Sequence, residues 1–285
     1  MLYVLLSVCC SIIVAVLIKI ARGREINVQQ LVLWNYPITV LLTYYFLQPN
    51  LHFNNITALP YAIYAPLIIL LPSLFIFIAL AIKYSGIVKT DVAQRMSLFI
   101  PLLASFIWFG EKLVFNKGLG IAIGLVAVLF SVSWNKSRNS EDSKSWIYPV
   151  IVFLGMGIID ILFKQIAQHQ EIPYTTSMFY VFVGAMLIGF LILAFKILFL
   201  KEAFDKPAIG WGLVLGVFNF GNIYLYMKAH RALPDNPSIV FTSMNIGVIV
   251  LGALVGMLVF REKLSKINQI GLILAIISIF IIAYL

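Results

Sequence analysis

Long runs of apolar residues, separated only by short polar gaps, constrain this chain more than any other feature of its sequence. A helix needs about 20 apolar residues to cross a hydrocarbon core of about 30 Å. Ten stretches meet this requirement, so the sequence predicts ten transmembrane helices joined by short loops. They cover residues 2–20, 28–47, 61–82, 87–109, 118–134, 146–167, 174–200, 208–228, 237–260 and 267–284.

The composition excludes a water-soluble protein. Hydrophobic residues make up 62% of the chain and charged residues only 11%, whereas about a quarter of the residues in a soluble domain are charged. So few charged side chains do not cover a water-facing surface, and the expected fold class is an all-α membrane protein in contact with lipid. The net charge of +9 lies mostly in the gaps between apolar runs. Basic residues in such gaps orient and anchor helices, so we expect no nucleic-acid partner.

An internal repeat divides the chain into two halves. Residues 109–113 read FGEKL, and residues 260–264 read FREKL, an offset of 151 residues. The polar stretch 135–145 lies between the halves and is typical of a solvated linker. Gly120 and Gly124 follow the first motif at a spacing that lets membrane helices approach closely, and the second half has a matching pair of small residues.

The repeat predicts the arrangement of the halves in the membrane. Residues 1–134 form repeat one, residues 135–145 the linker and residues 146–285 repeat two. Each repeat has five predicted helices, an odd number, so tandem copies must lie in opposite orientations. Ten transmembrane helices in two inverted five-helix repeats are typical of secondary transporters, whose substrate site lies near the midplane between the repeats.

These features resemble the drug/metabolite transporter superfamily, specifically its EamA-like members. In that family a G-E-x-L element follows the fourth helix of a repeat, and residues 110–113 match it. The second half departs from the element by having Arg261 in place of the glycine, but it keeps Glu262 and Leu264. The resemblance covers nearly the whole chain. It implies a transporter of small organic molecules, often an exporter of amino acids or other metabolites, in a bacterial inner (plasma) membrane. It does not identify the substrate.

Few ionisable residues lie in the interior of the predicted spans, where a charge is costly and by default marks function. Asp91 and Arg95 share one face of the fourth predicted helix, and Asp160 and Lys164 share one face of the sixth. Each pair has the alternative interpretation of a structural ion pair. For Asp160 and Arg95, which lie deeper, we favour a place in the lining of a cavity. A proton bound by Asp160 would couple transport to proton flow, and Arg95 would hold a substrate carboxylate.

Uncharged polar residues extend this candidate substrate site. Gln94 in the fourth helix maps onto Asn245 in the ninth at the repeat offset. In the eighth helix, Asn219, Asn222 and Tyr226 recur at spacings of three and four residues and therefore share a face. Each of these groups alone is explained by hydrogen bonding between helices. For the whole set, from four helices, we favour a polar pathway.

The sequence predicts neither a catalytic nor a metal site. His52, His169 and His230 fall in loops or at helix ends, without the spacing of metal ligands. Phosphate-binding, dinucleotide-binding and nucleophile-elbow motifs do not occur. We therefore expect no enzyme activity and no cofactor. The two cysteines, which are adjacent, do not reveal the redox compartment.

The leading hypothesis is a secondary carrier for a small polar metabolite such as an amino acid or organic anion. Its expected partners are that substrate, membrane lipid and protons, in a monomer or a homodimer. A membrane-embedded enzyme acting on lipid-linked substrates and a non-transporting scaffold are the alternatives. Loops after odd-numbered helices carry fourteen Lys and Arg against five in the other loops, with Arg95 left out. Positive loops stay in the cytoplasm, so we expect both termini outside, although many family members are drawn with termini inside.

Overall fold

Twelve helices and no strands form the regular structure of residues 1–51, 59–131, 146–261 and 265–284, the residues that this computed structural model describes. Within these ranges, the side chains of residues 87, 88, 91, 131 and 282–284 are not described. The first half contains α1 (Leu2–Gly23), α2 (Val28–Leu33), α3 (Asn35–Leu47), α4 (Tyr61–Ser85), α5 (Ile87–Met96), α6 (Phe99–Ile107) and α7 (Phe115–Ser131). The second half contains α8 (Ile147–Gln168), α9 (Tyr174–Leu198), α10 (Lys206–Ala232), α11 (Pro237–Leu258) and α12 (Lys266–Tyr284).

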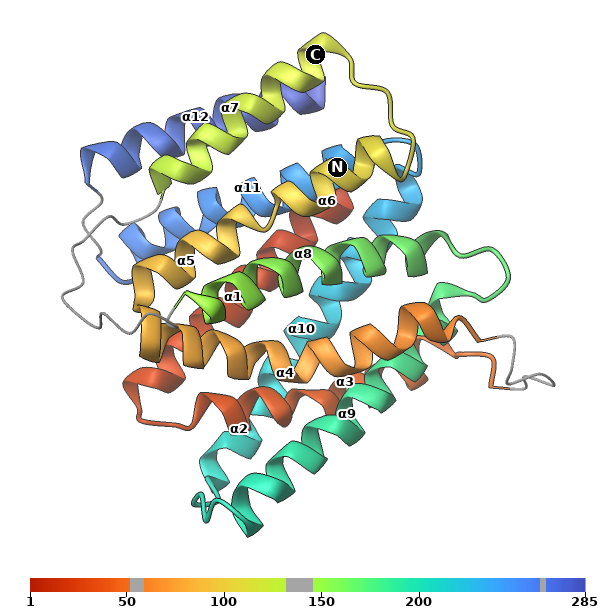
Figure 1. Cartoon of the computed structure of the whole chain (residues 1–285), viewed down its shortest axis with the longest axis vertical. Coiled ribbons are helices and arrows are strands. Elements are labelled where there is room, and N and C mark those ends of the chain that lie inside the picture. The colour runs from red at the N-terminus through yellow and green to blue at the C-terminus, as the bar shows by residue number, and fades with distance from the viewer. Residues whose placement is uncertain (52–58, 132–145, 262–264, 285) are drawn as a thin grey trace.

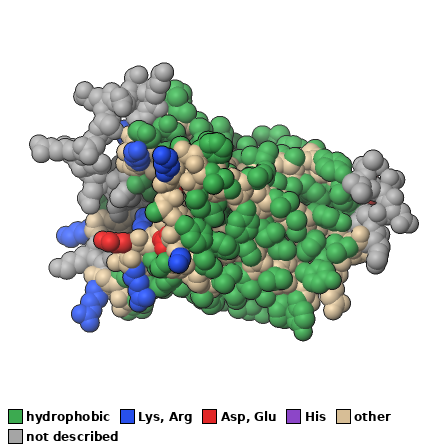
Figure 2. Space-filling view, turned by 90° about the horizontal axis from the view of Figure 1, so that it is seen from below, with side chains coloured by type: hydrophobic (Ala, Val, Ile, Leu, Met, Phe, Trp, Pro, Cys, Tyr) green, Lys and Arg blue, Asp and Glu red, His purple; other side chains and the backbone are tan. Residues whose placement is uncertain are grey.

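Most of these helices are apolar enough to lie in a membrane. In the described residues, α1, α4, α8, α9, α10 and α11 are the six helices whose length and composition suffice to cross it. Shorter apolar helices cover residues 92–107, 115–130 and 266–281. Figure 2 shows apolar side chains over the flank of the molecule, with Lys, Arg, Asp and Glu gathered at one end. This distribution is the one expected of a surface that faces lipid along its flank.

Two prolines explain why two of the predicted spans are divided. Proline has no N–H to donate, and its ring clashes with the carbonyl four residues earlier. Pro37 lies in the first turn of α3, and the helix before it, α2, ends at Leu33, four residues upstream. Pro101 lies in α6, and the break between α5 and α6 begins at Ser97, again four residues upstream. The second-half helices α9 and α11 run without a break.

Helices of the two halves interleave rather than forming separate bundles (Figure 1). Helix α1 packs against α10, and α4 packs against α8. Helix α3 also contacts α10, and α9 contacts α4. The last helices of the two halves, α7 and α12, pair along one edge of the molecule (Figure 1). The main core therefore draws buried side chains from both halves, including Leu67, Leu98, Met178 and Phe241.

Small residues permit two of the closest helix contacts between the halves. A Cβ atom at Gly216 in α10 would lie 2.5 Å from the carbonyl oxygen of Asn35 and against the Ile38 side chain. A Cβ atom at Gly124 in α7 would lie 2.6 Å from Ser278 Oγ in α12. The predicted close approach at Gly124 is therefore confirmed, and its partners are α12 and, through Ile246, α11.

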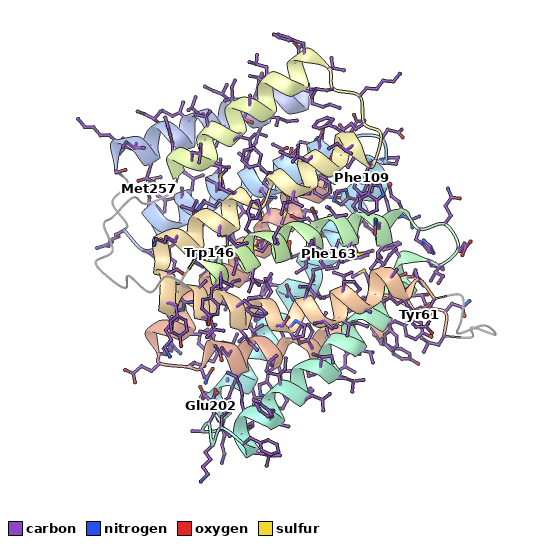
Figure 3. The ribbon with its side chains drawn as sticks, in the orientation of Figure 1. Tyr61, Phe109, Trp146, Phe163, Glu202 and Met257 are labelled. Atoms are coloured by element: carbon purple, nitrogen blue, oxygen red, sulfur yellow. The ribbon has the colours of Figure 1, made fainter. Side chains whose placement is uncertain are left out.

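The two ends of the helical array carry different residues. Tyr61 and Phe109 lie toward one end, and Trp146, Glu202 and Met257 lie toward the other (Figure 3). We call these the Phe109 end and the Glu202 end. Helices α1, α4, α9 and α11 begin at the Phe109 end, and α8 and α10 begin at the Glu202 end (Figure 1).

Candidate functional site

A hydrogen bond within the spanning helices joins two of the predicted site residues. Tyr226 in α10 donates its hydroxyl proton to Asp160 Oδ1 in α8 at 3.1 Å. The Tyr226 side chain is 5% exposed, so the contact lies in the interior. A carboxylate at the centre of a span costs about 2.5–3.5 kcal/mol on translocon scales. A hydroxyl donor offsets part of that cost and fixes the direction in which the carboxylate points.

The other two predicted residues of α10 bond helices of the first half. Asn219 Nδ2 donates to Asn35 Oδ1 in α3 at 2.9 Å. Ser7 Oγ in α1 lies 2.8 Å from Asn222 Oδ1 and 2.8 Å from the Asn222 carbonyl oxygen. The polar face of α10 therefore contacts α1, α3 and α8, with a different side chain toward each helix.

The remaining predicted residues are not joined to Asp160 by these contacts. Gln94 and Arg95 are half-buried in the last turns of α5. Arg95 also makes a noncovalent contact with another residue. Asn245 Nδ2 donates to the Phe241 carbonyl of its own helix at 3.0 Å. The side chain of Asp91 lies outside the described residues.

Lys164 is fully buried, one turn along α8 from Asp160. Its Nζ donates to the Pro234 carbonyl oxygen at 2.9 Å and lies 5.4 Å from the centre of the Phe109 ring. Asp160 bonds Tyr226 instead. The two side chains thus have separate partners, although both lie on α8.

His230, for which the sequence alone indicates no role, is also fully buried. Its ring lies 4.7 Å from the ring of Tyr226 and 4.7 Å from that of Phe241, measured between centroids. Neither ring nitrogen has a hydrogen-bond partner among the described residues. In the sequence, a single histidine in the last turn of an apolar helix does not reveal that its side chain is buried or which groups surround it.

A cavity of about 580 Å³ opens at the Phe109 end, and its lining includes Pro234, which bonds Lys164, and Arg231, which follows His230 in the chain. It lies among the C-terminal end of α8, the start of α9 and the C-terminal end of α10. Its lining residues are Ala167, Gln168, His169, Gln170, Pro173, Arg231 and Pro234. The Pro234 carbonyl accepts hydrogen bonds from both Lys164 Nζ and Gln168 Nε2, the latter at 3.0 Å. This carbonyl therefore links the buried lysine to the wall of the cavity.

The glutamate of the repeated motif has a specific structural partner. Glu111 is 7% exposed and accepts hydrogen bonds from the Ser238 backbone N–H at 2.8 Å and the Ser238 hydroxyl at 2.6 Å. It also pairs with Lys117 Nζ at 2.7 Å, and that Nζ reaches Asn236 Oδ1 at 2.7 Å. A carboxylate at the first turn of a helix satisfies free N–H groups and complements the helix dipole. Glu111 therefore joins the first half to the start of α11 in the second.

The residue before this glutamate has a left-handed backbone. Gly110 has φ +67°, a conformation that only glycine adopts without steric cost. Arg261, its counterpart in the second motif, has φ +54°. The backbone turn is thus common to both motifs, although only one of them has glycine there. Glu262 lies outside the described residues.

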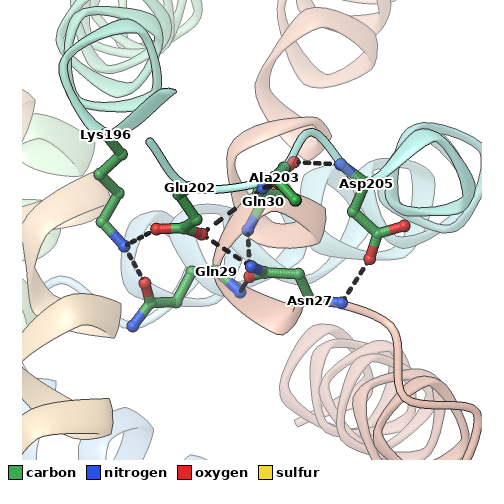
Figure 4. A network of polar contacts seen from close by, with 7 residues as sticks. All are labelled: Asn27, Gln29, Gln30, Lys196, Glu202, Ala203 and Asp205. Carbon is green, nitrogen blue, oxygen red and sulfur yellow. Dashed lines mark hydrogen bonds and ion pairs between the residues drawn. The ribbon is translucent and has the colours of Figure 1, made fainter. Parts of the chain in front are cut away.

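At the Glu202 end, the loop between α9 and α10 bonds the start of α2 (Figure 4). The Asn27 side chain accepts hydrogen bonds from the backbone N–H groups of Gln29 and Gln30, at 3.0 and 3.2 Å, and so caps α2. Asn27 Nδ2 donates to Glu202 Oε1 at 2.7 Å, and the Asn27 backbone N–H donates to Asp205 Oδ2 at 2.6 Å. The cap of a first-half helix is therefore held by two acidic residues of the second half.

The same network continues through Gln30 and Lys196. Gln30 Nε2 donates to the Ala203 carbonyl at 2.7 Å, and Gln30 Oε1 accepts from the Asp205 N–H at 2.9 Å. Lys196 Nζ lies 3.2 Å from Glu202 Oε2. Burial alone would raise the pKa of the Glu202 carboxyl, but hydrogen bonds from Asn27 and Lys196 hold that pKa below its usual value.

Two contacts between lysine and phenylalanine recur at opposite ends of the molecule. Lys19 Nζ in α1 lies 3.8 Å from the centre of the Phe260 ring, and Lys164 Nζ lies 5.4 Å from that of Phe109. Each contact pairs the first helix of one half with the motif phenylalanine of the other half. The two contacts differ in environment, because Lys19 is exposed and Lys164 is fully buried.

Comparisons with known proteins place these observations in a family. Residues 144–284 match the sequence model of the EamA-like transporter family. An uncharacterized protein of Haemophilus influenzae is 37% identical over 286 residues, which cover 98% of this chain and 96% of that protein. One solved crystal structure matches 99% of the chain and 98% of its own chain, with a TM-score of 0.70 and 13% identity. That likeness shows a shared fold only. The family match confirms the resemblance inferred from the motifs, and the chain belongs to the EamA-like transporter family.

Proposed function

We propose that the chain is a secondary transporter that exports a small polar metabolite by alternating access. Its family supports the coarser statement, that it is an integral membrane transporter of the drug/metabolite type. The observation that carries the finer proposal is the pairing of helices between the halves. Most contacts between a helix of one half and a helix of the other recur with the two roles exchanged, the contact of α7 with α11 being an exception.

This exchange supports two inverted five-helix repeats. If α2 with α3 and α5 with α6 each count as one span, the described helices correspond to ten spans, five on either side of residues 135–145. Helix α1 on α10 then corresponds to α8 on α4, and α3 on α10 corresponds to α9 on α4. The contacts of α7 with α12 and of α3 with α9 are unchanged when the two halves are exchanged. A two-fold axis in the membrane plane relates contacts in this way, and inverted-repeat transporters have such an axis.

Contacts between the halves at both ends support alternating access. At the Phe109 end, Glu111 bonds the start of α11. At the same end, the Asn50 backbone N–H donates to Thr176 Oγ1 at 3.1 Å, across the halves. At the Glu202 end, the network around Asn27 and Glu202 joins the halves. Rocking of one repeat against the other requires one set of contacts to open while the other stays closed.

The substrate site that we propose consists of polar residues inside the spans. Asp160 and Tyr226 form its best-defined part, because their hydrogen bond crosses between α8 and α10. Asp160 would bind the coupling proton, and Arg95 would contact a carboxylate of an amino acid or organic anion. The wider set proposed for substrate contact is Asp91, Gln94, Arg95, Asp160, Lys164, Asn219, Asn222, Tyr226 and Asn245.

Transport by purified protein in liposomes tests this proposal. The purified chain is placed in proteoliposomes, and uptake of radiolabelled amino acids and organic anions is followed with and without an imposed pH gradient. We expect accumulation of at least one solute above the level of empty liposomes. Asp160→Asn protein in the same liposomes is the matched control for pH-driven uptake. A folded protein that moves no solute from a broad metabolite panel would contradict the proposal and favour a scaffold or a lipid-directed enzyme.

The Haemophilus influenzae relative supports a bacterial inner membrane as the location.

A further inference from the structure

Lys164 carries a charge in the interior, but a neutral group is its hydrogen-bond partner. Its Nζ bonds the Pro234 carbonyl at 2.9 Å, and the side chain is fully buried. An ammonium group has three N–H donors, and it binds a carboxylate more strongly than a neutral carbonyl. Two of the nearby acidic residues bond other groups: Glu111 bonds Ser238 and Lys117, and Asp160 bonds Tyr226. A third, Asp235, is exposed at the surface. The lysine is thus suited to an acceptor stronger than the one it now has.

His230 adds a second group that lacks an acceptor. A neutral imidazole always has one N–H donor and one nitrogen acceptor. In His230 both nitrogens are buried without a partner among the described residues. A buried polar group without a partner costs about 1–3 kcal/mol. A ligand that accepts the His230 hydrogen bond would recover this cost.

The lining of the cavity near these residues contains one permanently charged group, the Arg231 guanidinium. This guanidinium lies 4.6 Å from the centre of the Tyr174 ring. Pro173, which also lines the cavity, directly precedes the start of α9, and the N-terminal end of a helix attracts anions. The volume of about 580 Å³ lies within the range of small-molecule sites. Glu171, next to the lining residues, is exposed and is the acidic group nearest in sequence to the start of α9.

We propose that this cavity, with Lys164 and His230 behind its wall, is the site that recognises a carboxylate group of the transported substrate. The carboxylate takes the place of the Pro234 carbonyl at Lys164 Nζ and accepts a hydrogen bond from the His230 ring. Arg231 attracts the anion at the cavity mouth. This inference rests on the proposed transport function. It adds a carboxylate-binding subsite in the second half of the chain, at the Phe109 end, to the carboxylate contact proposed for Arg95.

Matched pairs of carboxylates and primary amides test the inference directly. The probes are pyruvate with pyruvamide, benzoate with benzamide, and L-leucine with L-leucinamide, each titrated into the purified full-length protein while its Tm is measured. We expect at least one carboxylate to raise the Tm and its amide to leave the Tm unchanged. Lys164→Gln should weaken the apparent affinity for that carboxylate by about thirtyfold or more, because it removes one partner of a buried charged hydrogen bond.

Three further variants distinguish recognition from folding. His230→Gln keeps a side-chain N–H donor and should retain most of the affinity, whereas His230→Phe should lose it. Arg231→Gln should weaken binding less than Lys164→Gln. Lys112→Gln removes an exposed lysine near the same end and should leave the affinity unchanged.

Several outcomes overturn the inference. They are equal stabilisation by a carboxylate and its amide, stabilisation by none of the carboxylates, and an unchanged affinity in both Lys164→Gln and His230→Phe. Flux in proteoliposomes separates this failure from failure of the transport proposal. A protein that moves only neutral or cationic solutes would disprove carboxylate recognition and leave transport intact. Carboxylate-specific stabilisation without any flux would support carboxylate recognition and contradict the transport proposal.

Discussion

Glu111 Oε2 accepts a 2.8 Å hydrogen bond from the backbone N–H of Ser238, so a carboxylate of the first half caps a helix of the second. The motif that revealed the internal repeat therefore has a physical role. It supplies an acid that the start of a distant helix needs. The contact also explains why Lys117 follows at a short distance, because its ammonium group neutralises the same buried carboxylate.

Removal of this cap should lower stability. We expect Glu111→Ala to reduce the free energy of unfolding by about 1.5–3 kcal/mol, the usual range for a hydrogen bond to a charged group. Thermal unfolding of the purified protein measures the change. Glu171→Ala, which removes an exposed glutamate near the same end, is the control. If the two variants unfold at the same temperature, the Glu111 contacts contribute nothing to stability.

The turn before Glu111 should depend on glycine. Gly110→Ala places a Cβ on a residue with φ +67°, at a cost of about 1–2 kcal/mol. Apart from its chain neighbours, no atom of the described residues lies within 4 Å of the new Cβ, so the expected cost is conformational strain. Gly23→Ala, also without a neighbour within 4 Å but at the end of α1, should be nearly neutral. A Tm for Gly110→Ala at or above that of Gly23→Ala would show that the left-handed turn is absent.

Asp160 should be required for coupling to protons. Asp160→Asn keeps the shape of the side chain but removes the group that binds and releases a proton, so pH-driven flux should be abolished in a folded, inserted protein. Tyr226→Phe removes only the 3.1 Å hydrogen bond and should reduce flux less. Arg95→Gln should weaken affinity for carboxylate-bearing substrates more than for neutral ones. Normal pH-driven flux by Asp160→Asn would make this carboxylate purely structural.

Acid should weaken the network at the Glu202 end. The folded-state pKa of Glu202 is lowered, so its ionised form stabilises the folded state. This contribution is fully present above the unfolded-state pKa of about 4.3, and it is lost as the pH falls through the lower folded-state pKa. The Tm difference between the parent protein and Glu202→Gln should therefore be constant from about pH 5 to 7 and shrink below about pH 4. A difference that grows in acid would have the wrong sign for this network.

Membrane orientation is predicted by the distribution of basic residues. Fourteen Lys and Arg in one set of loops against five in the other place residues 135–145 in the cytoplasm. A single cysteine introduced there, in a variant with Cys9 and Cys10 replaced by serine, should resist an impermeant thiol reagent in intact cells. After the membrane is permeabilised it should react. Ready labelling in intact cells would reverse the orientation.

Hydropathy was sufficient to predict most helices, because a span in lipid must be apolar along its whole length. Helices α8, α9 and α11 agree closely with the predicted stretches 146–167, 174–200 and 237–260. The breaks after Leu33 and at Ser97 were not predicted, because Pro37 and Pro101 lie within otherwise continuous apolar stretches. A proline in the first turn of a helix is tolerated, and the chain here begins a new helix just before each one.

The candidate site was predicted residue by residue, but its pairings were not. Asp160 and Tyr226 were both selected because polar groups in a span are costly. Their hydrogen bond depends on the rotation of α8 and α10, which periodicity within one helix does not specify. His230 was missed because its significance lies in the absence of a hydrogen-bond partner, a property of packing. The positive φ of Arg261 was likewise hidden, because arginine does not indicate a left-handed turn.

The helix breaks before Pro37 and Pro101 occur in the first half, whereas the corresponding helices α9 and α11 are continuous. A continuous helix resists bending along its whole length, because each turn is bonded to the next. A broken one bends at the gap. The two repeats therefore differ in mechanical compliance, even though they share a fold. If the chain works by the alternating access proposed above, the second half would move as the stiffer unit, and the first half would bend around it.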